Sequence, residues 1–292
     1  MSMNLFQSVK NAISNLDPQE VRDQADRPIL IGLHAESERA YRQMANFFTP
    51  PQISEHKRFE LSRILFRASD FEHYDIDVYS EELNPPRDGF AFSPATPEQT
   101  VREVLRRRPD LALPLARHIY PFREPVVRRI ITKISRENAL FAVATAIPDI
   151  VPFLSLPWAI GEFASDTAFI TANQFRMGFF LAAASDRAVG YREQKAEIAS
   201  VLLGAFGWRA IARELVGHIP LGGGLLPKAA IAYAGTRVVG MSMDRYYRIG
   251  YGFTRDERRV AYEQALVKGK NVASALLSAL KRQPGPNPIA GT

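Results

Sequence analysis

Residues 138–253 are rich in Ala, Gly, Ile, Leu and Phe, yet charged residues interrupt every apolar run in them. The longest stretch of the chain without Asp, Glu, Lys or Arg extends from Leu215 to Pro227, which is 13 residues. A simple membrane-spanning helix needs about 20 apolar residues, and the longer apolar segment 139–163 contains Asp149 and three prolines. This pattern suits a soluble helical core, interfacial or re-entrant hairpins, or a clean multi-pass membrane domain. The sequence leaves all three open.

Charge divides the chain into an acidic head, a basic segment and an apolar body. Residues 1–100 carry 10 Lys/Arg and 16 Asp/Glu, residues 101–137 carry 10 and 4, and residues 138–292 carry 17 and 11. A basic segment next to an apolar one suits an anionic membrane surface, although a solvated helix face has the same composition. We define the basic collar as six cations of this segment: Arg106, Arg107, Arg108, Arg128, Arg129 and Lys133.

The amino-acid composition also excludes several kinds of catalytic and metal site. The chain contains no cysteine, which excludes disulfides, thiolate metal sites and cysteine nucleophiles and is typical of a reducing cytoplasm. The five histidines show no metal-ligand spacing, and no G-x-S-x-G motif occurs. We therefore expect no catalytic residue, no metal site and no cofactor.

The first 95 residues predict a small α/β unit. Residues 27–34 form a compact apolar run, and residues 74–80 alternate, so both predict strands, with a third at 90–93. Residues 4–16, 37–48 and 54–70 predict helices, the second of them capped by Ser37.

The turn after the first strand has the position of a phosphate-binding loop but not its residues. The motif requires G-x-x-x-x-G-K-[ST]. Here Gly32 is followed after five residues by Ser37, Glu38 and Arg39. Glu38 would repel phosphate where the motif has lysine, and Arg39 cannot supply the hydroxyl that binds Mg²⁺. We expect a degenerate P-loop-like unit, and a residual nucleotide-binding switch at 29–39 is the alternative.

The rest of the chain predicts helices. One begins at 96–108 with Thr96 as cap and Pro97 at the first helical position. Proline-punctuated helical segments follow, and then helices at about 163–188, 193–217 and 226–248. The last, at 254–281, has Thr254 and Glu257 in the spacing of a capping box. Residues 282–292 predict a disordered tail.

A glycine-rich turn precedes one of these helices. Gly222, Gly223 and Gly224 are followed by Pro227 and Lys228. Their spacing matches no phosphate fingerprint, so the main interpretation is a turn between two packed apolar helices. Small residues downstream (Ala230 and Ala234, Ala232 and Gly235) would let helix backbones approach closely. Lys228 in the first helical turn opposes the helix dipole unless an anion is near, so an anion or lipid headgroup is the alternative.

Other polar residues lie on apolar helices. Asp166, Asn173 and Arg176 share one helical face, and Arg209 and Arg213 are neighbours on another helix. Burying such charges unpaired is costly, so we expect a structural network, for example Asp166 paired with Arg209 or Arg213. A functional anion site at the two arginines is the alternative, and Arg128, Arg129 and Lys228 are further candidate anion or lipid contacts.

Aromatic and arginine residues alternate at 244–255. Tyr246, Tyr247, Tyr251 and Phe253 are interleaved with three arginines. This combination is typical of a membrane interface or a protein–protein surface. It is also used for single-stranded nucleic acid, but the acidic head would repel phosphate, so no nucleic-acid partner is expected.

The segments "NQFRMGFFLAAASDR" and "GAFGWRAIARELVGHIPLGGGLLPKAAIAYAGTRVVG" resemble the domain-of-unknown-function 697 family, with the best match over about 140–250. The resemblance implies a helical, membrane-associated domain that often follows a small GTPase domain in bacteria. It implies no catalytic residues. Glu38 and the short head depart from a full GTPase domain, so GTP hydrolysis is not carried over.

Together these features predict an α+β, mainly α fold. The expected parts are an α/β unit at 1–95, the basic collar segment at 96–137, an apolar helical domain at 138–281 and the tail. The expected function is that of a non-enzymatic, membrane-associated scaffold or regulator on the cytoplasmic side. It would contact anionic lipid, and a GTPase, another protein or a second copy are possible partners. A soluble helical interaction module is the remaining alternative.

Overall fold

The computed structural model describes residues 11, 13–68, 73–145, 166–194 and 225–281. The chain divides into two compact units. The α/β unit comprises residues 18–129 and 179–190, and the helical unit comprises 1–17, 130–178 and 191–292. The fold is α+β and mainly helical, with one small parallel sheet near the N-terminus, as the sequence predicts.

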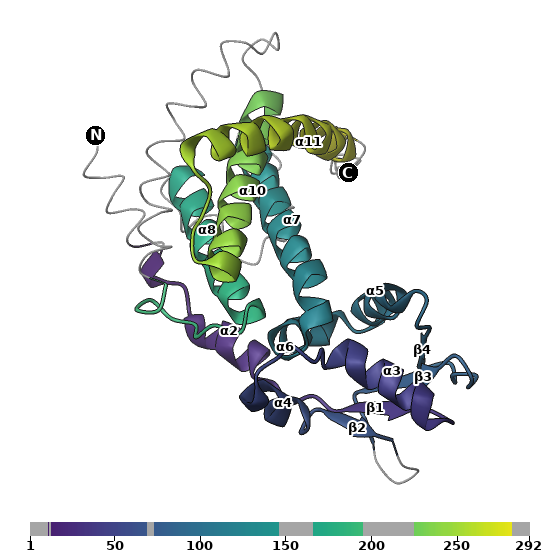
Figure 1. The fold of residues 1–292 in the computed structure, drawn as a ribbon. Helices are drawn as coiled ribbons and strands as arrows, with labels where there is room; N and C mark the ends of the chain where they lie inside the picture. Colours follow the sequence, from purple (N-terminus) through teal and green to yellow (C-terminus); the bar gives the residue numbers. More distant parts are fainter. Residues whose placement is uncertain (1–10, 12, 69–72, 146–165, 195–224, 282–292) are drawn as a thin grey trace, which may run out of the picture. The chain divides into compact units, whose positions relative to one another are not determined.

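The α/β unit is built on a four-stranded parallel sheet in the order β2-β1-β3-β4. The strands are β1 (Ile31–His34), β2 (Leu65–Arg67), β3 (Ile76–Ser80) and β4 (Phe90–Phe92). Ile31 stands opposite Leu65 on one side and Ile76 on the other, so β1 is central. Helix α3 (Glu38–Phe48) packs against β1 and β3 (Figure 1).

The strands expected at 27–34, 74–80 and 90–93 are confirmed, but the helix expected at 54–70 is wrong in its second half. Helix α4 (Glu55–Leu61) ends early, and β2 follows it. The segment from Leu65 to Arg67 becomes a strand because it pairs with β1, which is a contact across more than 30 residues. Helical periodicity within the segment carries no information about that pairing.

The cap expected at Ser37 is confirmed, and the side-chain cap expected at Thr96 is absent. The Ser37 hydroxyl accepts from the backbone N–H of Ala40 at 3.1 Å, and Ser54 caps α4 in the same way. Helix α5 (Pro97–Arg107) begins where expected, but the Thr96 side chain makes no capping hydrogen bond. Its hydroxyl is therefore not what starts α5, whereas Pro97 occupies the first helical position.

The described part of the α/β unit also contains α2 (Pro18–Ala25), a 3₁₀ turn (Pro109–Leu111), α6 (Ala112–His118) and the first part of α7 (Tyr120–Ala144). The end of α8 (Asp166–Ala184) and the residues after it also belong to this unit.

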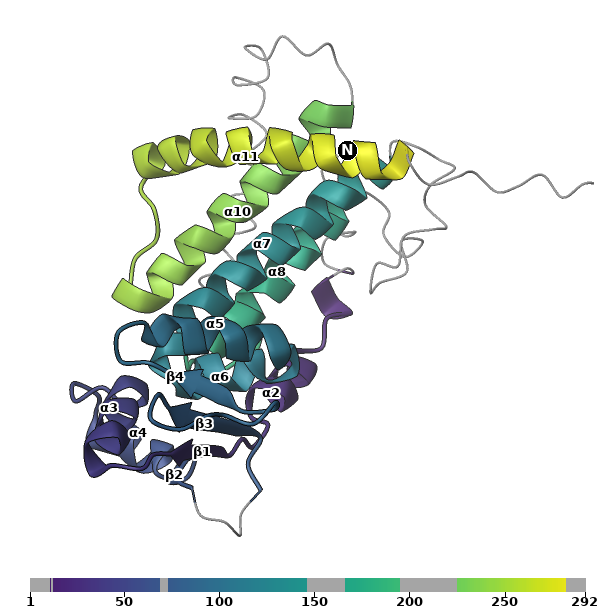
Figure 2. The same ribbon diagram turned by 90° about the vertical axis from the view of Figure 1, so that its right-hand side faces the viewer.

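The described residues of the helical unit include the remaining parts of α7 and α8, with α10 (Leu225–Ile249) and α11 (Arg255–Lys281). Helices α7, α8 and α10 lie side by side, and α11 crosses α10 (Figure 2). The capping box expected at the start of α11 is confirmed. The Thr254 N–H donates to Glu257 Oε2 at 2.9 Å, and the Glu257 N–H donates to Thr254 Oγ1 at 3.3 Å.

Small residues set the crossing of α10 and α11. Ala230 of α10 is buried, and a Cβ on Gly269 of α11 would lie 2.7 Å from the Ala230 carbonyl oxygen. The close backbone approach expected at Ala230 is thus present, whereas Gly235 has no atom within 4 Å of its Cβ position. Tyr262 of α11 is also buried in this core, and its burial raises the pKa to about 12.

Several expected features lie outside the described residues. These are the glycine turn Gly222–Gly224, Arg209 and Arg213, most of the helices expected at 4–16 and 193–217, and the tail at 282–292.

Candidate functional site

A pocket of about 500 Å³ lies within the α/β unit. Its walls come from the end of α3, from α4, from the α6–α7 junction and from Asp186, just past the end of α8. The apolar lining residues are Phe48, Pro50, Ile53 and Leu61, and the charged or titratable ones are His56, Lys57, Glu60, His118, Tyr120, Arg123 and Asp186. None of these was singled out by sequence reasoning as a site residue.

Lys57 forms ion pairs with both carboxylates that line the pocket. Its Nζ lies 2.6 Å from Asp186 Oδ2 and 2.9 Å from Glu60 Oε2, and its side chain is mostly buried. The hydrogen bond from Lys57 lowers the pKa of Glu60. Burial acts to raise the pKa of Asp186, but the hydrogen bond and charge of Lys57, with Arg117, outweigh it and lower that pKa. Both carboxylates are therefore ionised near pH 7 and share the single charge of Lys57, and the charges of Arg117 and Arg123 also act on Asp186.

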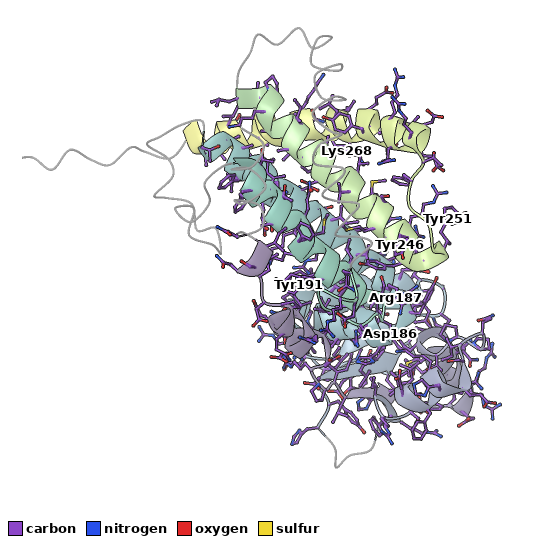
Figure 3. All side chains as sticks on the ribbon, turned by 90° about the vertical axis from the view of Figure 1, so that its left-hand side faces the viewer. Asp186, Arg187, Tyr191, Tyr246, Tyr251 and Lys268 are labelled. Atoms are coloured by element: carbon purple, nitrogen blue, oxygen red, sulfur yellow. The ribbon has the colours of Figure 1, made fainter. Side chains whose placement is uncertain are left out.

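The backbone after α8 presents Asp186 to this pocket. Arg187 N–H donates to the Ala182 carbonyl at 2.9 Å, and Asp186 N–H donates to the Ala183 carbonyl at 3.1 Å. This is a Schellman motif, which needs a left-handed residue, and Asp186 has φ 58°. Aspartate accepts that conformation more readily than most residues. Figure 3 labels Asp186 and Arg187 at this end of α8. A helix C-cap thus fixes a charged pocket residue.

Arg117 secures the same turn from α6. Its Nε lies 2.9 Å from Asp26 Oδ1 and 4.0 Å from Asp186 Oδ1, and it donates to the Arg187 carbonyl at 3.1 Å. The side chain is mostly buried. The turn after α8 is therefore held by two cations, Lys57 and Arg117.

The α6–α7 junction contributes two basic side chains with unused polar atoms to the pocket. Arg123 Nε and His118 Nδ1 are both buried and have no hydrogen-bond partner among the described residues. Arg123 donates from its Nη2 to the Arg117 carbonyl at 3.5 Å, and its guanidinium lies 5.7 Å from the Tyr120 ring. Burial lowers the pKa of Arg123, and burial followed by the charge of Lys57 lowers that of His118. His118 is therefore neutral near pH 7.

In open α/β sheets, ligands commonly bind at the carboxyl ends of the strands. In this protein, acidic side chains lie at that edge of the sheet. The Ser37 hydroxyl, at the start of α3, lies 3.1 Å from both oxygens of Glu82, and Ser93 donates to Glu81 at 2.9 Å. Glu38 is in the first turn of α3. This edge disfavours a phosphate, which agrees with the rejection of the P-loop motif.

Gly32 is not part of a loop. It lies within β1, and a Cβ there would meet the Tyr74 ring at 2.5 Å. The glycine is required by packing against this ring. Next to it, His34 Nε2 lies 2.7 Å from Asp77 Oδ1, and its ring stacks on Tyr79 at 4.1 Å.

The basic collar is largely engaged with its own protein. Arg107 donates to the Gly89 and Arg87 carbonyls at 2.9 Å, and Arg129 donates to the Leu105 carbonyl at 3.1 Å. The others pair with nearby carboxylates: Arg106 with Glu103, Arg108 with Asp110, Arg128 with Glu124 and Lys133 with Glu137. Hydrogen bonds and ion pairs within the chain account for much of this charge.

The polar network expected on α8 is present in the helical unit, with other partners. Asn173 is buried and donates to Asn138 Oδ1 at 2.9 Å and to Glu137 Oε2 at 3.3 Å. Arg176 lies 3.6 Å from Glu137, and Asn138 donates to Thr236 at 2.7 Å. The network therefore joins α7, α8 and α10. Sequence reasoning missed Glu137 and Asn138, and the side chain of Asp166, like Arg209 and Arg213, is not among the described ones.

Lys228 and Pro227 lie in the first turn of α10, as expected. Lys228 Nζ contacts Thr145 Oγ1 at 3.3 Å.

The turn between α10 and α11 exposes large apolar side chains. Tyr246 is 36% exposed, Ile249 52% and Tyr251 59%, and Figure 3 places Tyr246 and Tyr251 at the C-terminal end of α10. Gly250, with φ 85°, ends the helix there. Arg245 lies 5.1 Å from the Tyr251 ring and 2.6 Å from Glu257. We call Tyr246, Ile249 and Tyr251 with the arginines of 245–258 the aromatic turn.

Comparison with family models, curated proteins and solved structures found no significant match. In the described ranges, no helix combines the length and the apolar character that a bilayer crossing requires. The same ranges contain no group of three or more His, Asp or Glu side chains suited to a metal ion.

Proposed function

We propose that this protein is a membrane-associated scaffold or regulator that catalyses no reaction, and that it attaches peripherally to the cytoplasmic membrane through the aromatic turn. The observation that supports this proposal is the exposure of Tyr246, Ile249 and Tyr251 within six residues. Isolated exposed apolar side chains are ordinary, but a group of them beside arginines is typical of an interfacial site.

The charge of this segment suits an anionic surface. Residues 244–259 contain five arginines against Asp244, Asp256 and Glu257, a net charge of +2. Arg245 is held under Tyr251 by its pair with Glu257, which keeps the ring in place. Arg245 and Arg248 pair with Glu257 and Asp244, as cations of the basic collar pair with carboxylates of their own, so charge alone does not separate the two segments. The exposed apolar side chains of the aromatic turn are what favour it.

The expected attachment is weak and reversible. Full burial of one such apolar side chain contributes about 1.5–3 kcal/mol, and each basic residue near an anionic membrane contributes about 1 kcal/mol. Partial burial of three side chains with a small net charge gives reversible binding that salt weakens. The resemblance to a membrane-associated family that often follows a GTPase domain makes a GTPase a candidate partner.

Vesicle co-sedimentation tests the proposal. The full chain is mixed with vesicles of phosphatidylcholine alone or with added phosphatidylglycerol, at low and high salt. We expect binding to the anionic vesicles, which falls with salt, and loss of binding in the double variant Ile249→Ser/Tyr251→Ser.

The matched control is Val267→Ser on α11, because Val267 is 63% exposed but lies outside the aromatic turn. It should bind as the wild type does. Equal vesicle binding by the double variant and the wild type would refute attachment through the aromatic turn. Absence of binding to anionic vesicles would refute the membrane proposal itself.

A further inference from the structure

The pocket of the α/β unit contains a guanidinium whose hydrogen-bonding capacity is unused. Arginine carries five N–H donors, and the contact from Arg123 to the Arg117 carbonyl is long, at 3.5 Å. Arg123 Nε is buried without a partner among the described residues. A buried donor left unsatisfied is costly, so this position favours an acceptor supplied by a ligand.

The carboxylates of the pocket already have cationic partners. Asp186 and Glu60 both contact Lys57, and Arg117 lies on the other oxygen of Asp186. Neither carboxylate forms an ion pair with Arg123 within the described part of the chain. The charges of Lys57 and Arg123 balance those of Glu60 and Asp186, and Asp186 also interacts with Arg123 through its charge. What remains unmet is the donor capacity of the Arg123 guanidinium, and the acceptor that suits a cationic donor best is an anionic oxygen.

His118 adds a second polar atom to the same pocket. Its Nδ1 is buried and unpartnered among the described residues. A neutral imidazole with its proton on Nδ1 donates one hydrogen bond, so it can contribute beside the guanidinium. The planar fork of arginine matches carboxylate and phosphate oxygens equally well.

The remaining lining is apolar. Phe48, Ile53 and Leu61 face the pocket, and its volume of about 500 Å³ lies in the range of small-molecule sites. An inorganic ion would leave these side chains uncovered. We propose that this pocket binds a small organic anion, with its carboxylate or phosphate on Arg123 and His118 and its apolar body against Phe48, Ile53 and Leu61.

Isothermal titration calorimetry on the full chain tests the site with four probes. Phenyl phosphate and benzoate share a ring and differ in the oxyanion, benzyl alcohol lacks the charge, and inorganic phosphate lacks the ring. We expect at least one organic anion to bind more tightly than benzyl alcohol and inorganic phosphate by about tenfold or more, since charge-assisted hydrogen bonds and ring burial both contribute. The tighter of phenyl phosphate and benzoate identifies the headgroup.

Two variants locate the binding. Arg123→Gln should lower the affinity for the organic anion by about tenfold or more, because the hydrogen bonds to the anion then lose the charge of their donor. Arg128→Gln is the matched control, since Arg128 lies on the same helix and pairs with Glu124 at the surface. It should bind as the wild type does. Far-UV circular dichroism verifies that both variants are folded.

A third variant is expected to strengthen anion binding instead of weakening it, so a general loss of structure cannot imitate its effect. Asp186→Asn removes one carboxylate from Lys57 and keeps a residue that tolerates the left-handed backbone. The partly released lysine should then tighten anion binding by several-fold. Equal affinities of the wild type and Arg123→Gln, or equal affinities for benzyl alcohol and the organic anions, would overturn the proposal. The vesicle experiment concerns the other unit, so the two proposals fail independently.

Discussion

Gly269 lies where α11 crosses α10, and its replacement by alanine gives a quantitative test of how the two helices pack. The added Cβ would lie 2.7 Å from the Ala230 carbonyl oxygen and 3.2 Å from the Ala230 Cα. Both are backbone atoms, so no side chain can rotate away. Relief requires the two helices to separate locally.

The size of the effect follows from that distance. Ordinary contacts begin at 3.4 Å, so the clash amounts to about 0.7 Å. If the helices move apart to relieve the clash, a gap opens between their other contacting atoms. A gap of about 0.5–1 Å forfeits roughly a quarter to a half of the dispersion energy of each such contact. Overpacking of this kind typically costs about 1–3 kcal/mol. Alanine recovers about 1 kcal/mol of helix propensity. We expect Gly269→Ala to destabilise the helical unit by about 1–2 kcal/mol.

Gly235→Ala is the matched control, because this α10 glycine has nothing within 4 Å of its Cβ position. It should stabilise the helical unit by about 0.5–1 kcal/mol through helix propensity alone. Hydrogen exchange followed by mass spectrometry reads the two helices separately from the α/β unit. Amides of α10 and α11 should exchange faster in Gly269→Ala and slower in Gly235→Ala, with α3 and α5 unchanged. If Gly269→Ala were as protected as Gly235→Ala, the inferred close crossing would be wrong.

Three further outcomes are expected. Ser37→Ala should cost the α/β unit about 1 kcal/mol in urea denaturation, because its hydroxyl caps α3, whereas Thr96→Ala should be nearly neutral, because that hydroxyl makes no capping bond. Asn138→Ala should destabilise the helical unit by about 1–3 kcal/mol in the same assay, since it removes two buried hydrogen bonds and leaves Thr236 and Asn173 only their longer bonds to Gln174 and Glu137. The pKa of Glu257 is lowered to about 2 by hydrogen bonds from an arginine and a backbone N–H, so its contribution is full above about pH 4.5 and is lost as the pH falls toward 2. The difference in Tm between the wild type and Glu257→Gln, measured by circular dichroism, should therefore shrink over that range, and a constant difference would contradict the assignment.

Features that depend on a few neighbouring residues could be predicted from the sequence. The Ser37 cap, the Thr254–Glu257 capping box and the strands at 76–80 and 90–92 all depend on groups within four residues or on strict alternation. The small face at Ala230 was also predictable, because a short side chain permits a close helix crossing whatever its partner is.

Features that depend on pairing across the chain could not be predicted. The strand at 65–67 exists because β1 supplies its hydrogen bonds, and helical periodicity in the same residues pointed the other way. Asn173 was expected to be paired, but its partner Asn138 is 35 residues away on another helix. The identity of a buried polar partner is decided by packing, which brings the two side chains together.

The pocket in the α/β unit shows the same division most clearly. The alanine-rich run before Asp186 favours a helix, and the helix predicted there extended to about residue 188, whereas α8 ends at Ala184 and Asp186 takes the left-handed conformation. Nothing in that run indicates that Lys57, 129 residues earlier, would meet its carboxylate at 2.6 Å, or that Arg123 would remain with unused donors. The sequence alone determined most of the helices and strands and the caps at Ser37 and Thr254, because short-range hydrogen bonds and periodicity act within a few residues. The tertiary structure decided which charges pair with one another and which donors remain for a ligand, because that depends on distances between segments far apart in the chain.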